Sequence, residues 1–233
     1  MLKNYYYDNI EEIIKWRNLN IPFLGIPSTF KLDRIDDINK NYDIKICIYG
    51  CSFAYGDKLP VEETFGHLIK KHFENQGKSV GLFNFGIIGG SNDLISRMVI
   101  CTIPLIKPNF SIVSFSFPER REGIDNSGVI RTIMKHRRDM CLDKNSLNVI
   151  DTINNYSNIT NFLVNYKAIE GVLNNYCKWT YSTMTHDIFD FFSNHFDKEK
   201  YAGDFSIIDK LPDGHPGPLT NEIMKEKYLK KLI

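Results

Sequence analysis

The chain of 233 residues has little net charge and lacks a long hydrophobic run. Its 29 lysines and arginines nearly balance its 28 acidic residues, so the net charge of +1 creates no field that would attract nucleic acid or an acidic membrane. No run of about 18 apolar residues occurs, and residues 1–16 lack the apolar core of a signal peptide. We therefore expect a cytoplasmic protein that binds neither nucleic acid nor a membrane.

Metal and cofactor motifs are also missing. The five cysteines are an odd number and show neither Cys-x-x-Cys nor His-Cys ligand spacing, which argues against a disulfide framework and against a zinc site. The glycine-rich stretch at 86–90 does not contain the Gly-x-Gly-x-x-Gly pattern of dinucleotide-binding proteins. The sequence therefore predicts no cofactor and no metal.

Alanine is rare, since it occurs only at positions 54, 168 and 202, whereas asparagine, isoleucine and lysine are abundant. This composition is typical of AT-rich genomes, such as those of some phages and viruses, so association with a virion is an open alternative to a purely cytoplasmic location. Hydrophobic residues make up 42% of the chain and no linker-like segment interrupts it, which predicts one domain with a sizeable core.

Apolar strands and amphipathic helices alternate along the sequence. Strands are expected at 42–49, 79–86, 110–117 and 178–184, and helices at 63–77, 92–106, 153–178, 186–196 and 217–233. This alternation is typical of an α/β fold with a mostly parallel sheet and right-handed crossovers. In such a fold, ligands bind beyond the carboxyl ends of the strands.

Two segments do not fit the strand and helix repeat. An N-terminal helical extension is expected over about 1–40, with an amphipathic helix at 8–19. An insertion at about 119–177 is expected to fold over the functional site as a cap, because loops at the carboxyl edge of a sheet often determine specificity. Both belong to a single domain that spans residues 1–233.

Three loops that carry chemically useful residues are expected to meet at the carboxyl edge of this sheet. Ser52 follows the first strand, Gly89 follows the second, and Asp213 and His215 precede the last helix. A serine hydroxyl needs a histidine to accept its proton, and a carboxylate holds that histidine in place. This arrangement predicts nucleophilic catalysis by a serine.

The same three segments resemble the motifs of the SGNH, or GDSL-like, hydrolase superfamily. They read "YGCSFAYG" at 49–56, "NFGIIGG" at 84–90 and "PDGHPGPLT" at 212–220, in the family's order. The resemblance implies a three-layer α/β/α sandwich of the flavodoxin-like type. It also implies that Ser52 is the nucleophile, that Asp213 and His215 complete the triad, and that Gly89 gives its backbone N–H to an oxyanion hole.

The resemblance implies a serine esterase or deacylase that acts on an O-acyl ester, such as an acetyl ester, of a carbohydrate or a similar small substrate. Two alternatives remain open at this stage. An O-acyltransferase would use the same triad with a sugar hydroxyl in place of water. A non-catalytic carbohydrate-binding or virion structural module could also be built on this fold.

Two details of the motifs leave residue roles open. Cys51 stands where the family motif carries aspartate, and we expect it to be a small buried hydrophobic residue rather than a nucleophile. The spacing of one residue between Asp213 and His215 does not determine which side of the imidazole Asp213 reaches. Asp209 is the reserve candidate for the acidic partner.

The clearest departure from the family pattern follows the strand at 110–117. The family usually supplies an asparagine to the oxyanion hole there, but this chain continues "PERRE" at 118–122. Losing one such donor typically lowers the rate about a hundredfold to a thousandfold. Asn92, Arg120 or another group must substitute, or the site is slow or has another use. Arg120 and Arg121 could instead bind a carboxylate or phosphate of the substrate, or simply remain exposed or paired with acidic residues.

Overall fold

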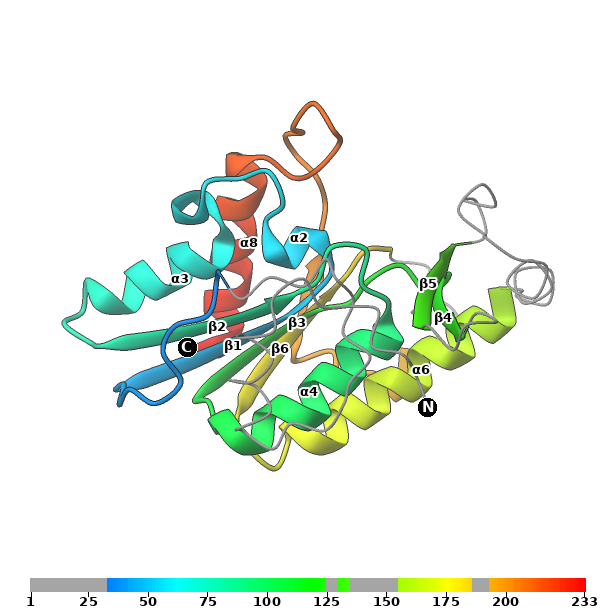
Figure 1. Cartoon of the computed structure of the whole chain (residues 1–233), viewed down its shortest axis with the longest axis horizontal. Helices are drawn as coiled ribbons and strands as arrows, with labels where there is room; N and C mark the ends of the chain where they lie inside the picture. The colour runs from blue at the N-terminus through cyan, green and yellow to red at the C-terminus, as the bar shows by residue number, and fades with distance from the viewer. Residues whose placement is uncertain (1–32, 125–129, 135–154, 186–192) are drawn as a thin grey trace.

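The computed structural model describes residues 33–124, 130–134, 155–185 and 193–233 (Figure 1). The predicted helix at 8–19 and most of the N-terminal extension lie outside the described residues. Of the predicted helix at 186–196, only the last part is described, and it contains the short 3-10 helix η3 (Ser193–His195).

Five parallel strands form the central sheet in the order β2-β1-β3-β6-β7. Their bounds are β1 (Ile44–Gly50), β2 (Val80–Gly86), β3 (Phe110–Ser114), β6 (Lys178–Thr183) and β7 (Tyr201–Asp204). This order is that of a flavodoxin-like sheet, in which the chain reverses its direction of winding between β1 and β3. Ligands of such sheets bind at this switch point, at the carboxyl ends of the strands.

Helices cover both faces of the sheet, as Figure 1 shows. The helices α3 (Phe65–Glu74) and α8 (Pro218–Leu232) lie on one face, and α4 (Asn92–Ile106) and α6 (Asn155–Leu173) lie on the other. Alternate side chains of a strand point to opposite faces. Accordingly, Ile46 and Ile48 of β1 pack in the core under α3 and α8, and Cys47 and Tyr49 pack under α4 and α6. The predicted three-layer α/β/α sandwich is confirmed.

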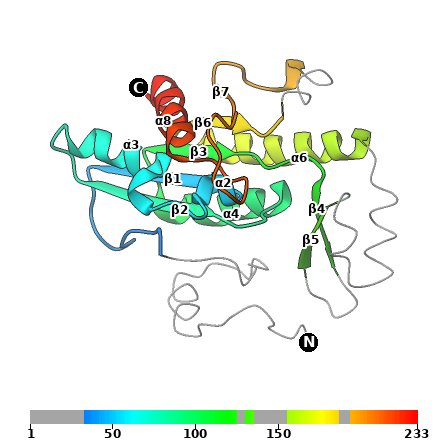
Figure 2. The same ribbon diagram turned by 90° about the horizontal axis from the view of Figure 1, so that it is seen from above.

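The segment at 119–177 contains two different structures. An antiparallel hairpin of β4 (Arg120–Ile124) and β5 (Ile130–Met134) stands apart from the main sheet, on the side of the strands' carboxyl ends (Figures 1 and 2). The helix α6 instead packs its Phe162 and Tyr166 into the core, so it is the crossover helix between β3 and β6. A cap over the site therefore remains a prediction only for the part of the segment that precedes α6.

The last part of the predicted N-terminal extension lies along the edge of the sheet. Ile35 forms an antiparallel bridge with Phe83, and the Asp36 N–H donates to the Leu82 carbonyl at 2.9 Å. These contacts satisfy part of the free edge of β2, which would otherwise expose unpaired backbone groups. None of the helices in the described ranges has the length and apolar character needed to cross a membrane.

Candidate active site

The turn between β1 and α2 (Ser52–Tyr55) places Ser52 at the carboxyl edge of the sheet. Strand β1 ends at Gly50, and a Cβ atom there would lie 2.5 Å from the Ala54 Cβ and 2.8 Å from the Ser114 carbonyl oxygen. Only glycine therefore fits without movement of the turn. Cys51 is completely buried, as the sequence analysis expected, and Ser52 is the first residue of the helix, with 4% of its surface exposed.

Strand β2 holds this short helix in position. The buried Asn84 side chain donates from Nδ2 to the Ala54 carbonyl and accepts from the Gly86 N–H, each at 2.9 Å. Gly86 lies directly under α2, because a Cβ atom at this position would be 2.4 Å from the Tyr55 nitrogen. The second motif thus supports the turn that carries Ser52 through its asparagine and its first glycine.

Replacing Gly86 with alanine should lower the free energy of unfolding, because the new methyl group would collide with backbone that cannot rotate away. We expect a loss of about 2 to 3 kcal/mol, the upper range for overpacking of a core, measured by urea denaturation. Gly171 is the matched control, since it lies in α6 with no atom within 4 Å of an added Cβ. Gly171→Ala should raise stability by about 0.5 to 1 kcal/mol. Equal effects of the two substitutions would contradict the close approach at Gly86.

The glycine-rich turn after β2 lies beside the nucleophile turn. The Ile87 N–H donates to the Gly50 carbonyl at 2.9 Å, and Gly89 has a φ of 75°, a left-handed conformation that favours glycine. Ser91 then begins α4 by accepting the Leu94 N–H. Within the described part of the chain, the backbone N–H groups of Ser52 and Gly89 have no hydrogen-bond acceptor. Both donors are therefore free to bind an oxyanion.

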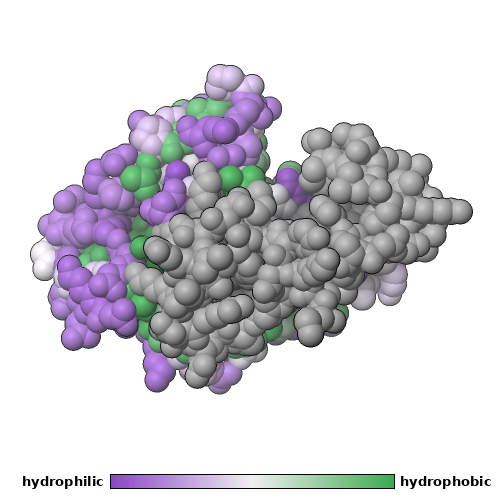
Figure 3. All heavy atoms as spheres, in the orientation of Figure 1, coloured by the Kyte–Doolittle hydropathy of each residue, from purple (hydrophilic) through white to green (hydrophobic). Residues whose placement is uncertain are grey.

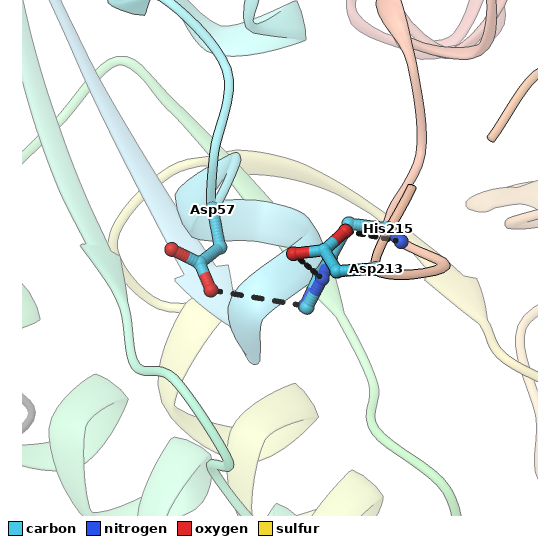
Figure 4. A group of neighbouring side chains, drawn as sticks. All are labelled: Asp57, Asp213 and His215. Carbon is cyan, nitrogen blue, oxygen red and sulfur yellow. Dashed lines mark hydrogen bonds and ion pairs between the residues drawn. The ribbon is translucent and has the colours of Figure 1, made fainter. Parts of the chain in front are cut away.

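His215 lies between two carboxylates (Figure 4). Its Nδ1 atom is 3.1 Å from the Asp213 Oδ2, which is close enough for an ion pair. The two groups are not aligned well enough for a hydrogen bond. The His215 backbone N–H donates to the other Asp213 oxygen at 3.1 Å. This hydrogen bond, together with the nearby imidazole, lowers the pKa of Asp213. Asp213 therefore approaches the Nδ1 side of the imidazole, the question that the sequence left open.

The other side of the imidazole faces the nucleophile turn. The Phe53 ring contacts the His215 ring edge to face at a centroid distance of 5.7 Å, and the Asp57 Oδ2 lies 3.9 Å from His215 Nε2. Asp57 belongs to the same turn as Ser52, because its N–H donates to the Ser52 carbonyl at 3.0 Å. Two residues that follow Ser52 in this turn, Phe53 and Asp57, thus lie against His215.

Asp57 is a site residue that the sequence motifs do not identify. Its position five residues after Ser52 was the only signal, and nothing in the sequence shows that this loop meets the one before the last helix. Asp57, Asp213 and His215 each offer one atom within 4.8 Å of the others, so among the described residues they are the group that could also ligate a cation. The same arrangement of an imidazole between carboxylates suits proton transfer.

The Asp209 carboxylate is bound to the start of α8, so it does not have the position of a triad acid. It accepts the backbone N–H of Thr220 at 2.7 Å, the Thr220 hydroxyl at 2.6 Å and the Leu219 N–H at 3.0 Å. Burial raises the pKa of Asp209, but these hydrogen bonds outweigh burial, so the pKa is lowered. Asp209 therefore holds the first turn of α8, where a negative charge is favourable.

Asn92 and Arg120 lie near the end of β3, where the family asparagine is missing. Asn92 donates from Nδ2 to the Ser116 carbonyl at 3.0 Å and accepts the Ser116 N–H at 2.8 Å. This reciprocal pair fixes the chain after β3 and leaves one Nδ2 hydrogen for an oxyanion. Arg120 donates to the Ser116 hydroxyl at 3.2 Å. Whether either residue replaces the missing donor stays a prediction.

Comparison with solved structures identifies the fold. The chain is similar to TesA with a TM-score of 0.54 and 13% identity, over 81% of this chain and 97% of that one. An acetyl xylan esterase, AlAXEase, matches with a TM-score of 0.52 and 15% identity, over 82% of this chain and 100% of that one. A family 3 carbohydrate esterase of Clostridium thermocellum matches with a TM-score of 0.50 and 12% identity, over 81% of this chain and 96% of that one. No protein-family model and no curated protein matches the sequence. The chain has the SGNH or GDSL-like hydrolase fold that its motifs predicted.

Proposed function

We propose that the protein is a serine esterase or deacylase that removes an acyl group, such as acetyl, from a carbohydrate or a similar small ester. The observation that carries this proposal is the contact of His215 with the turn that carries Ser52, through Phe53 and Asp57, while Asp213 lies at its Nδ1 atom. Similarity in fold to an acetyl xylan esterase and to a carbohydrate esterase supports the substrate class.

Acylation requires a base, a nucleophile and an oxyanion site in one place. In the proposed reaction, the Ser52 hydroxyl attacks the acyl carbonyl and gives its proton to His215 Nε2. Asp213 stabilises the imidazolium that forms. The N–H groups of Ser52 and Gly89, which lack acceptors within the described residues, hold the negative oxygen of the tetrahedral intermediate. Collapse of the intermediate releases the alcohol, which takes its proton from His215.

Deacylation repeats these steps with water. His215 accepts a proton from the water molecule that attacks the acylated Ser52, and it returns that proton to the Ser52 oxygen as the carboxylic acid leaves. If a second alcohol enters in place of water, the same intermediate gives acyl transfer. The open alternative of an O-acyltransferase therefore shares every protein group with the esterase.

Labelling with a fluorophosphonate tests the proposal without knowledge of the substrate, because the reagent reacts with an activated serine. We expect one adduct per chain, located at Ser52 by peptide mass spectrometry. The adduct should be lost in Ser52→Ala and much reduced in His215→Ala, since the hydroxyl then has no base.

An adduct on Cys51, or none on well-folded protein, would count against the serine triad. The second outcome would favour the alternative of a non-catalytic binding module on the same fold. Hydrolysis of a chromogenic acetyl ester by wild type, compared with acetyl transfer to added sugars, then separates the esterase from the acyltransferase.

A further inference from the structure

Arg120 differs from the other arginines whose side chains the structure describes. Arg34 donates to two backbone carbonyl groups, and Arg97 forms a bidentate ion pair with Glu122. The Arg120 side chain makes one hydrogen bond within the described residues, from Nη1 to the Ser116 hydroxyl, and it has no carboxylate partner there. Its Nε atom is buried without an acceptor. A guanidinium carries five N–H donors, so most of its capacity is unused.

The Nε atom of the neighbouring Arg121 is also buried without a hydrogen bond, but Arg121 has other partners in the fold. Its Nε atom lies 3.9 Å from Asp93, and its Nη1 donates to the Ser157 carbonyl of α6 at 3.4 Å. Asp93 also accepts from the Glu122 N–H, which attaches the hairpin to α4. The sequence offered both arginines as anion-binding candidates, and the structure separates them, because among the described residues Arg121 has an acidic neighbour and Arg120 has none.

The position of Arg120 is fixed at the switch point of the sheet. Its guanidinium stacks on the Phe117 ring at 5.1 Å, a cation–π contact that covers one of its faces. Ser116, its hydrogen-bond partner, lies two residues beyond Ser114, which pairs with Gly50 of β1 in the neighbouring strand. Adjacent strands are about 4.8 Å apart, so Arg120 is held at the same edge as Ser52. Figure 3 shows the side of the molecule seen in Figure 1, with hydrophilic residues covering much of the coloured surface.

A second polar group at this edge also lacks a partner. Asn158 has an exposed fraction of only 5%, and its Oδ1 atom has no hydrogen bond. It lies one turn before Phe162 on the same face of α6, and Phe162 packs on Phe115 at 4.9 Å. The preceding residue, Ser157, accepts from Arg121 through its carbonyl, so this end of α6 lies beside the start of β4, next to Arg120. A buried carbonyl oxygen without a donor is costly unless a ligand supplies one.

We propose that Arg120 and Asn158 form a substrate subsite that selects esters carrying an oxyanionic group and a hydrogen-bond donor. Arg120 binds the carboxylate or phosphate of the substrate through its unused N–H groups, and Asn158 accepts from a hydroxyl or N–H. This subsite rests on the proposed esterase function and specifies its substrate class as acyl esters of acidic, hydroxylated compounds. The anionic group of the substrate would then form an ion pair with the Arg120 guanidinium, which has no such partner among the described residues.

Matched acetyl esters test the subsite. Hydrolysis of 4-acetoxybenzoate and of 4-acetoxyphenyl phosphate is compared with that of the neutral 4-acetoxybenzamide, and kcat/KM is measured for each. We expect wild type to prefer the anionic esters, and we expect Arg120→Gln to lower the ratio of anionic to neutral kcat/KM about tenfold to a hundredfold, mainly through KM. Arg120→Lys keeps the charge but not the planar guanidinium, so it should lower this ratio less than Arg120→Gln does. The preferred anion of the two identifies carboxylate or phosphate as the natural group.

Arg121→Gln is the matched control, because it removes an equal charge one residue away and should leave the ratio unchanged. An equal fall of both rates in Arg120→Gln would indicate an oxyanion donor and would overturn the subsite, as would a wild type without anionic preference. Thermal unfolding checks that each variant is folded.

A binding measurement separates failure of the subsite from failure of the esterase. Equilibrium dialysis of 4-acetoxybenzoate against Ser52→Ala, with and without Arg120→Gln, needs no turnover. Binding that depends on Arg120 in a protein that hydrolyses no ester would support the subsite and refute the esterase. Absence of both binding and turnover would refute the subsite and the esterase together.

Discussion

Ser52→Ala is expected to reduce kcat for a chromogenic acetyl ester by roughly 10³ to 10⁶, the range seen when a triad nucleophile is removed. The variant retains the turn between β1 and α2, because the Ser52 contacts that shape this turn come from its backbone carbonyl, which accepts from Gly56 and Asp57. Loss of activity would therefore reflect loss of the nucleophile. Initial rates at saturating ester, with circular dichroism as the check on folding, provide the measurement.

Cys51→Ala is the matched control for this experiment. Cys51 is adjacent to Ser52 but completely buried, so its thiol should be inaccessible to substrate and to iodoacetamide. We expect kcat to stay within about threefold of wild type, with a loss of stability of about 1 kcal/mol from the small cavity. If Cys51→Ala were inactive and Ser52→Ala active, the nucleophile would be the cysteine.

Asp213→Asn is expected to lower kcat about 10² to 10⁴, because the amide neither stabilises the imidazolium nor holds the correct tautomer of His215. The His215 backbone N–H lowers the pKa of Asp213 below its ordinary value, so protonation of Asp213 should not contribute to any loss of activity between pH 5 and 8. The loss in Asp213→Asn should accordingly be similar across that range. Rate profiles of wild type and variant against pH test this.

Two other aspartates serve as comparisons. Asp57→Asn removes the carboxylate that lies 3.9 Å from Nε2, the side from which the Ser52 proton arrives in the proposed reaction, so it should lower kcat less than Asp213→Asn. Asp209→Asn changes a group that holds the start of α8 and should affect stability rather than kcat. A larger loss in Asp57→Asn than in Asp213→Asn would reverse the assignment of the supporting acid.

Much of the fold follows from local patterns in the sequence. The strand at 110–117 is almost continuously apolar, as expected of a strand covered on both faces, and β3 lies in the centre of the sheet. The helix predicted at 92–106 is α4 with the same bounds, because Ser91 caps its start. Four of the five strands of the sheet were predicted in this way.

The elements that were not predicted have weak local signals. Strand β7 has four residues, is only partly buried, and contains Gly203 at a φ of 103°. The hairpin β4–β5 lies in a charged segment without regular alternation of apolar residues. The role of α6 was also misjudged in part, since a helix that covers a sheet and a helix that covers a site have similar amphipathic patterns.

The sequence by itself determined the parallel α/β fold and the motif residues Ser52, Asp213 and His215, because strand pattern, glycine turns and helix starts depend on residues that are near neighbours in the chain. Only the tertiary structure placed Asp57 beside His215 Nε2, distinguished Arg120 from Arg121, and buried the Asn158 Oδ1 atom without a partner. Each of these depends on which surfaces of distant segments pack together. That packing is decided by burial of the whole core, which no local pattern records.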